Sequence, residues 1–113
     1  MAWLLREGEV LASLEIARSR RERSRGLLGR DGIEGALLIP ATRSVHTMGM
    51  RFPIDVAFCE AEGEREFVVL RIVQMRRGRV SRPSLSSRAV IEAEAGAFAR
   101  WNLRPGDQLE AKE

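Results

Sequence analysis

The strongest structural constraint in this sequence is a two-residue alternation over residues 54–59, followed by an acidic turn and a second apolar run. The apolar residues at positions 54, 56 and 58 would point to one face of a strand, whereas Asp55, Ala57 and Cys59 would point to the other. Residues 60–64 contain three glutamates and a glycine, and residues 67–75 are again mostly apolar. The pattern predicts a β-hairpin around this turn.

Weaker patterns predict the remaining elements. Residues 3–6 and 10–17 flank a Glu-Gly-Glu turn, which indicates an opening hairpin. Ser19 and Glu22 have the spacing of a capping box, so we expect a short helix that runs to about Leu28. Further strands are expected at residues 35–40, 89–93 and 108–111, with one or two helical turns at 96–103. The fold class that follows is α+β, predominantly antiparallel β: a compact barrel- or sandwich-like single domain with one short capped helix.

The length and composition fit one folded domain. The chain has 113 residues, 44% of them hydrophobic and 31% charged, which suffices for one apolar core and leaves no room for two. The single Cys59 excludes an intramolecular disulfide. The N-terminal apolar stretch is too short for a secretory signal, and no segment approaches the length of a membrane-spanning helix. We therefore expect a soluble, cytoplasmic protein with a reduced thiol and no membrane partner.

Arginine supplies nearly all the positive charge, because 18 of the 19 basic residues are Arg; the net charge is +3. One stretch, between residues 67 and 91, has no acidic residue and contains Arg71, Arg76, Arg77, Arg79, Arg82 and Arg88. Such a basic loop could contact phosphates, which makes a nucleic-acid-associated accessory domain an alternative function. The loop has no aromatic side chain on which single-stranded bases could stack, and this favours a solvated loop.

Three segments, taken in order, resemble a known family. They are residues 17–30, which end in Gly-Leu-Leu-Gly-Arg; residues 45–58, Val-His-Thr-Met-Gly-Met-Arg-Phe-Pro-Ile-Asp-Val-Ala-Phe; and residues 90–107, which begin Val-Ile-Glu-Ala-Glu-Ala-Gly and end Leu-Arg-Pro-Gly-Asp. Together they resemble the prokaryotic family known as domain of unknown function 192, over nearly the whole chain. The resemblance implies a compact, mainly β domain. It implies no activity, cofactor or catalytic residue.

The candidate binding site lies in the segment that carries this resemblance most specifically, residues 42–55. A non-enzymatic module could bind a small polar or anionic ligand there, or a protein partner, with the basic loop at the rim. The candidate ligand-binding residues are Arg18, Arg25, His46, Met48, Met50 and Asp55. For Asp55 a structural role is the alternative, because a carboxylate inside an apolar strand needs an arginine or backbone N–H groups as partners.

Two further interpretations stay open. His46 and Asp55 could be the base and orienting group of a small hydrolase, although no known catalytic motif surrounds them. Its nucleophile would be one of Cys59, Ser84, Ser86 and Ser87. His46, Met48 and Met50 offer soft ligands suited to Cu(I), but methionine commonly fills gaps in a core. The glycines between residues 26 and 32 lack the Lys and Ser/Thr of a phosphate-binding loop. We therefore expect no metal, no cofactor and no catalytic residue.

Overall fold

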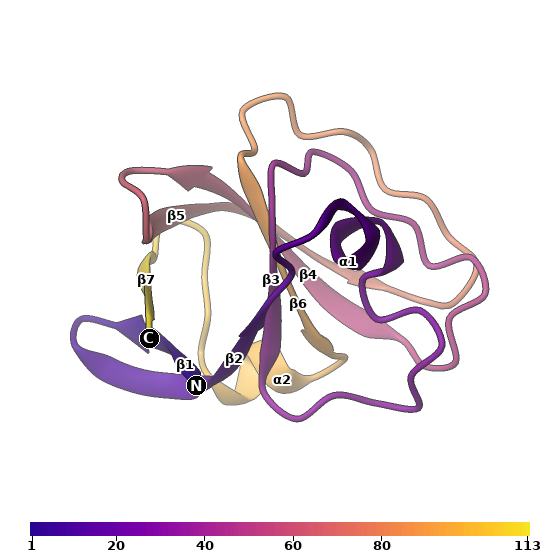
Figure 1. Cartoon of the computed structure of the whole chain (residues 1–113), viewed down its shortest axis with the longest axis horizontal. Helices are drawn as coiled ribbons and strands as arrows, with labels where there is room; N and C mark the ends of the chain where they lie inside the picture. Colours follow the sequence, from indigo (N-terminus) through magenta and orange to yellow (C-terminus); the bar gives the residue numbers. More distant parts are fainter.

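Both predicted hairpins are present in the computed structural model, which describes all 113 residues (Figure 1). β1 (Ala2–Arg6) and β2 (Glu9–Ile16) pair around Glu7 and Gly8, whose φ angles of 53° and 79° make a tight turn. β4 (Ile54–Ala61) and β5 (Glu66–Met75) form the second hairpin. The alternation over residues 54–59 is thus confirmed as a strand.

Seven strands close into a barrel in the order β1-β2-β3-β6-β4-β5-β7, and β7 pairs with β1. The remaining strands are β3 (Ala36–Pro40), β6 (Ala89–Glu94) and β7 (Gln108–Lys112). Neighbouring strands are antiparallel except β2 and β3, which are parallel and are joined by a crossover that contains α1 (Arg20–Arg25). The predicted fold class is confirmed, and of the two predicted architectures the chain adopts the barrel.

The helix α1 begins as predicted and ends earlier. Ser19 Oγ accepts a hydrogen bond from Glu22 N–H at 3.0 Å, and Glu22 Oε1 accepts one from Ser19 N–H at 2.9 Å, which completes the capping box. Gly26 has φ 53° and ψ −129°, so the helix ends at Arg25 rather than near Leu28. The second helix, α2 (Ala97–Arg100), is a single turn. Neither helix has the length and apolar sequence needed to cross a membrane.

The sheet formed by β3, β6 and β4 is buried on both faces. Its inner face joins an apolar cluster inside the barrel through residues such as Ala57, Cys59 and Ile91. Its outer face carries Ile54, Val56, Phe58 and Val90, which belong to a second cluster. A cover layer, made of α1, residues 26–33 and residues 41–53, packs onto that outer face through Leu27, Val45, Met50 and Phe52. Figure 1 shows this layer gathered on one side of the barrel, beside β3, β4 and β6.

Candidate functional site

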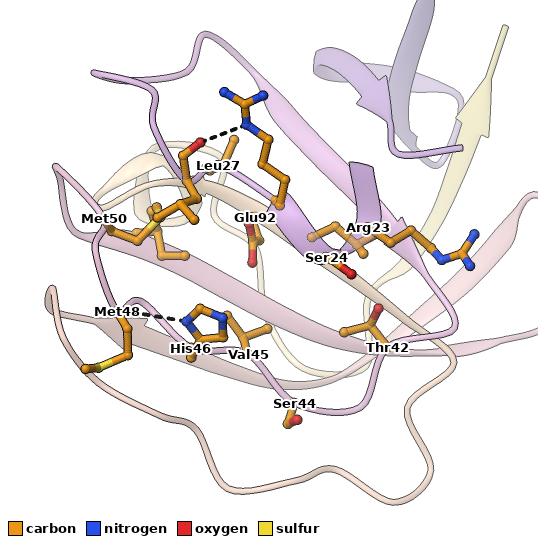
Figure 2. A pocket seen from close by; sticks show the side chains of 15 residues that line it. Arg23, Ser24, Leu27, Thr42, Ser44, Val45, His46, Met48, Met50 and Glu92 are labelled. Atoms are coloured by element: carbon orange, nitrogen blue, oxygen red, sulfur yellow. Dashed lines mark hydrogen bonds between the residues drawn. The ribbon is translucent and has the colours of Figure 1, made fainter. Parts of the chain in front are cut away.

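A pocket of about 330 Å³ opens between the cover layer and the outer face of the sheet (Figure 2). Apolar side chains from both layers line it, among them Leu27, Ile39, Val45 and Ile54. The polar lining includes the hydroxyl groups of Ser24, Thr42 and Ser44, the imidazole of His46 and the carboxyl group of Glu92. A concave volume near 300 Å³ that combines apolar surface with polar groups is in the size range of small-ligand sites.

Glu92 is the only charged side chain that the strands contribute to this pocket. It lies on β6 between Leu37 of β3 and Val56 of β4, and it is only 4% exposed. No protein group donates a hydrogen bond to its carboxyl oxygens or forms an ion pair with them. Burial raises the pKa of Glu92 from its ordinary 4.5 to about 7, because removal from water disfavours the charged form.

His46 contributes to the same pocket from the loop between β3 and β4. Its Nδ1 accepts a hydrogen bond from Met48 N–H at 3.3 Å, which leaves Nε2 as the donor of the ring. The next residue, Thr47, is fully buried and anchors the loop. Its Oγ1 donates to the Arg76 carbonyl at 2.6 Å and accepts from Arg79 N–H at 2.8 Å. Thr47 therefore holds the His46 backbone against the segment that follows β5.

The pocket includes four of the six predicted ligand-binding residues: Arg25, His46, Met48 and Met50. Met50 is buried in the outer apolar cluster, whereas Met48 is exposed. The guanidinium of Arg25 does not reach Glu92, because its Nε donates to the Leu28 carbonyl at 3.2 Å. These residues come together in a pocket where seven of the fifteen lining residues are hydrophobic and seven are polar or charged.

Asp55 and Arg18 lie outside this pocket. Asp55 is 4% exposed and projects from the opposite face of β4. Its Oδ2 accepts from the N–H groups of Gly96 and Phe98 at 2.9 and 3.0 Å, and its Oδ1 accepts from Gln74 Nε2 at 3.1 Å. The carboxylate therefore ties the start of α2 to β4, which is the structural role considered for it. Arg18 forms an ion pair with Glu113.

The arginine-rich loop runs beside the His46 segment. Three backbone hydrogen bonds join the two segments. Thr47 N–H donates to the Arg79 carbonyl at 2.7 Å. Ser81 N–H donates to the Val45 carbonyl, and Ser84 N–H to the Arg43 carbonyl, both at 2.8 Å. The two segments converge, but the pocket with Glu92 includes no residue of this loop. Arg76, Arg77 and Arg79 line a separate open groove with Gly49 and Pro53.

The arginines of this stretch differ in their surroundings. The guanidinium of Arg71 lies 4.4 Å from the centre of the Phe58 ring and donates to the Arg82 carbonyl at 2.7 Å, so Arg71 is part of the packing. The others are exposed and form no ion pair; they are Arg76, Arg77, Arg79, Arg82 and Arg88.

A model of the DUF192 family, described as an uncharacterized ACR, matches residues 3–111. The chain belongs to this family. The family that the three sequence segments resembled is thus confirmed over nearly the whole chain.

Two solved structures have the same fold as this DUF192 chain. A protein of unknown function from Novosphingobium aromaticivorans DSM 12444 is 21% identical, with a TM-score of 0.68 over 96% of this chain and 82% of that one. A proposed transcription regulator from Sinorhizobium meliloti 1021 is 22% identical, with a TM-score of 0.75 over 97% of this chain and 91% of that one. At these identities the similarity shows the fold alone. No curated protein matches the chain.

The DUF192 fold does not bring together the residues that the hydrolase interpretation needs. His46 lies on the outer side of the sheet and Asp55 on the inner side. Cys59 is buried inside the barrel, and this burial raises the pKa of its thiol to about 12, far from the range of a reactive thiolate. Ser87 is also buried, and its Oγ donates to the Thr42 carbonyl at 2.8 Å. No three side chains among His, Cys, Asp and Glu gather in one place.

Glu92 is the site residue that sequence reasoning misses in this DUF192 chain. It stands among Val90, Ile91 and Ala93 in a strand, and Asp55 shows the same pattern of a carboxylate within an apolar strand. The signal is therefore present in the sequence. What differs is the environment, because Asp55 meets backbone N–H groups whereas Glu92 meets a pocket.

Proposed function

We propose that this DUF192 domain is a binding module for a small polar molecule, held in the pocket between the cover layer and the sheet. The observation that carries the proposal is the burial of Glu92 at the pocket wall without a protein partner. Burying an ionisable group without a hydrogen-bond partner costs free energy, and such groups concentrate at functional sites. A ligand that donates a hydrogen bond to Glu92 would offset this cost.

The placement of the other candidate residues favours binding over catalysis and a polar ligand over an anionic one. Binding is favoured because His46 and Asp55 are separated by the sheet and the Cys59 thiol is buried. A polar ligand is favoured because Arg18 lies elsewhere and the Arg25 guanidinium turns towards Leu28. We also propose a cytoplasmic location, in which the lone Cys59 stays reduced.

The proposal is tested by screening small polar fragments against the full chain by NMR. Fragments that bind in the pocket should shift the backbone amides of Leu27, Val45 and His46, which line it on two sides. Ser24→Trp places a bulky side chain at an exposed position of the lining and should abolish these shifts without unfolding the protein. Ser86→Trp, at an exposed position outside the pocket, is the matched control. If no fragment moves the lining amides, or if Ser24→Trp binds as well as the parent, the proposal is wrong.

A second candidate function rests on a different observation: five exposed arginines between residues 76 and 88 have no acidic partner. We propose nucleic-acid association through this loop as the alternative. Fluorescence anisotropy with mixed-sequence RNA and DNA at two salt concentrations is the test. Binding through phosphates should weaken steeply as salt rises, and no binding at low salt excludes it.

A further inference from the structure

We propose that the molecule held in this pocket is a small organic cation, a protonated amine on a short apolar stem, with Glu92 as its counter-ion. The inference rests on the proposed function and adds the charge class of the ligand. It follows from three features of the pocket: the single carboxyl group inside it, the direction of the nearby arginines, and the aliphatic side chains that line it together with Glu92.

The first feature is that no protein cation neutralises Glu92. Two arginines of α1 line the pocket, yet neither pairs with the carboxyl group. Figure 2 shows the Arg23 side chain extending away from Glu92 towards the outside of the pocket. The Arg25 guanidinium lies over the turn after α1, where it donates to Leu28. A cationic ligand would supply the positive charge that no protein side chain brings to Glu92.

The second feature is the set of titratable groups around Glu92. From α1 these are Arg23 and Arg25, from the loop after β3 His46, and from β6 itself the exposed Glu94. On either side β3 and β4 place only Leu37 and Val56 opposite it. An anionic ligand would therefore meet a carboxyl group directly, with the arginine heads turned away. An ammonium group would meet a carboxyl group that no protein group pairs with, and a hydrogen bond between two charged groups is stronger than a neutral one.

The third feature is the lining beyond the carboxyl group. Leu27, Ile39 and Ile54 present aliphatic surface next to Glu92, which suits a short hydrocarbon stem. Hydroxyl groups of Ser24, Thr42 and Ser44 also line the pocket, and hydroxyl oxygens accept hydrogen bonds from N–H donors. The pocket thus combines a carboxyl group for the ammonium with aliphatic surface for the stem, and neither lining arginine pairs with that carboxyl group.

Pairing with a cation favours the charged form of Glu92, so binding should lower its pKa from about 7. A carboxyl group that is partly protonated near neutral pH would then release its proton when the amine binds. Amine binding should therefore strengthen as the pH rises from 6 to 8, provided that the amine itself stays protonated over this range.

The experiment compares three probes of one stem and different charge: n-butylammonium, n-butanol and butyrate, each titrated into the full chain and followed by NMR. We expect n-butylammonium to give saturable shifts at Leu27, Val45 and Glu92, and butyrate to give none. Glu92→Gln should weaken the amine at least tenfold, about 1.4 kcal/mol, and leave butanol unchanged. Glu94→Gln removes an exposed carboxylate on the same strand and should leave amine affinity unchanged. In the parent chain, saturating amine should lower the midpoint at which the ¹³C-labelled Glu92 carboxyl titrates.

The outcomes separate the two proposals. If butanol or butyrate binds this pocket as well as the amine does, the ligand is not a cation, but the pocket remains a binding site. If no probe shifts the lining amides and the fragment screen is also negative, both proposals are wrong. If Glu94→Gln weakens the amine as much as Glu92→Gln, the attraction is a general surface effect and the assignment of Glu92 fails. An unchanged Glu92 titration midpoint in saturating amine also overturns it.

Discussion

The carboxyl group of Glu92 lies against the backbone of Gly26, so closely that a Cβ atom at position 26 would be 3.3 Å from Glu92 Oε1. Gly26 also has φ 53° and ψ −129°, a backbone conformation that is strained in any residue with a side chain. Gly26→Ala is therefore expected to destabilise the fold by about 1–3 kcal/mol and to displace the turn after α1 from Glu92. Urea denaturation measures the first effect, and amide shifts at residues 26–28 report the second.

The matched control for this change is Gly78→Ala. Gly78 has φ 73°, and a Cβ atom there would meet nothing within 4 Å, so the substitution adds only backbone strain of about 1 kcal/mol. Equal losses of stability in the two variants, with no shift near Glu92, would show that the contact between Gly26 and Glu92 has no energetic role.

Glu92 is expected to make the fold less stable as the pH rises. Its pKa is about 7 in the folded chain against an ordinary 4.5, so between these values the folded state keeps a proton that the unfolded state loses. Stability therefore falls as the pH rises from about 4.5 and levels off above about 7. Since a shift of one pKa unit corresponds to about 1.4 kcal/mol, the free energy of unfolding should fall by about 3 kcal/mol over this pH range.

Glu92→Gln isolates this effect, because it keeps the size of the side chain and cannot ionise. The variant should be more stable than the parent at about pH 8, by up to about 3 kcal/mol, and close to it at about pH 4. Denaturant midpoints at both pH values give the comparison, with the exposed Glu94→Gln as the control. The same difference at both pH values would mean that ionisation of Glu92 is not its cause.

Asp55→Ala removes the acceptor of two backbone N–H groups, those of Gly96 and Phe98. Leaving buried donors unpaired is costly, so we expect a loss of about 2–4 kcal/mol, measured by thermal or chemical unfolding. Asp31→Ala is the comparison, because the Asp31 side chain is 88% exposed and its ion pair with Arg51 lies at the surface. That variant should lose less than about 1 kcal/mol. If Asp55→Ala loses no more than this, Asp55 does not anchor α2.

Thr47→Val keeps the shape of a buried side chain and removes the hydroxyl group that joins the His46 loop to Arg76 and Arg79. We expect a loss of about 1–3 kcal/mol and faster trypsin cleavage after Arg76 and Arg79, because the segment loses its anchor. Mass mapping of brief digests measures the cleavage rates. Ser86→Ala, at an exposed position of the same loop, should cleave like the parent. If trypsin cleaves Thr47→Val no faster than the parent, contacts other than the Thr47 hydroxyl group hold the loop.

The strands could be predicted because their signal is local. The alternation over residues 54–59 and the turn before residue 67 specify the β4–β5 hairpin, and Ser19 with Glu22 specifies the start of α1. The end of α1 depends on the backbone angles of Gly26, which a glycine in the sequence does not reveal. Closure of the barrel depends on pairing between β1 and β7, at opposite ends of the chain, and no local pattern encodes it.

The site was harder to predict because its partners lie far apart in the sequence. Asp55 and Glu92 share one local pattern, and only the structure shows that one meets the N–H groups of α2 while the other meets a pocket. His46, Met48 and Met50 are neighbours in one loop, so the sequence groups them, and all three line the pocket. Arg25 enters the pocket lining as well, but the direction of its guanidinium depends on the Leu28 carbonyl in the turn after α1.

The sheet that is buried on both faces separates the pocket, on its outer side, from the apolar cluster inside the barrel. Of the fifteen residues that line the pocket, only Ile39, Ile54 and Glu92 belong to strands; the other twelve belong to the cover layer. The hydrogen bonds that close the barrel run between strands and are independent of those twelve side chains. In the binding role proposed above, substitutions at these twelve positions would change which ligand fits, while the strand pairing that closes the barrel stays the same.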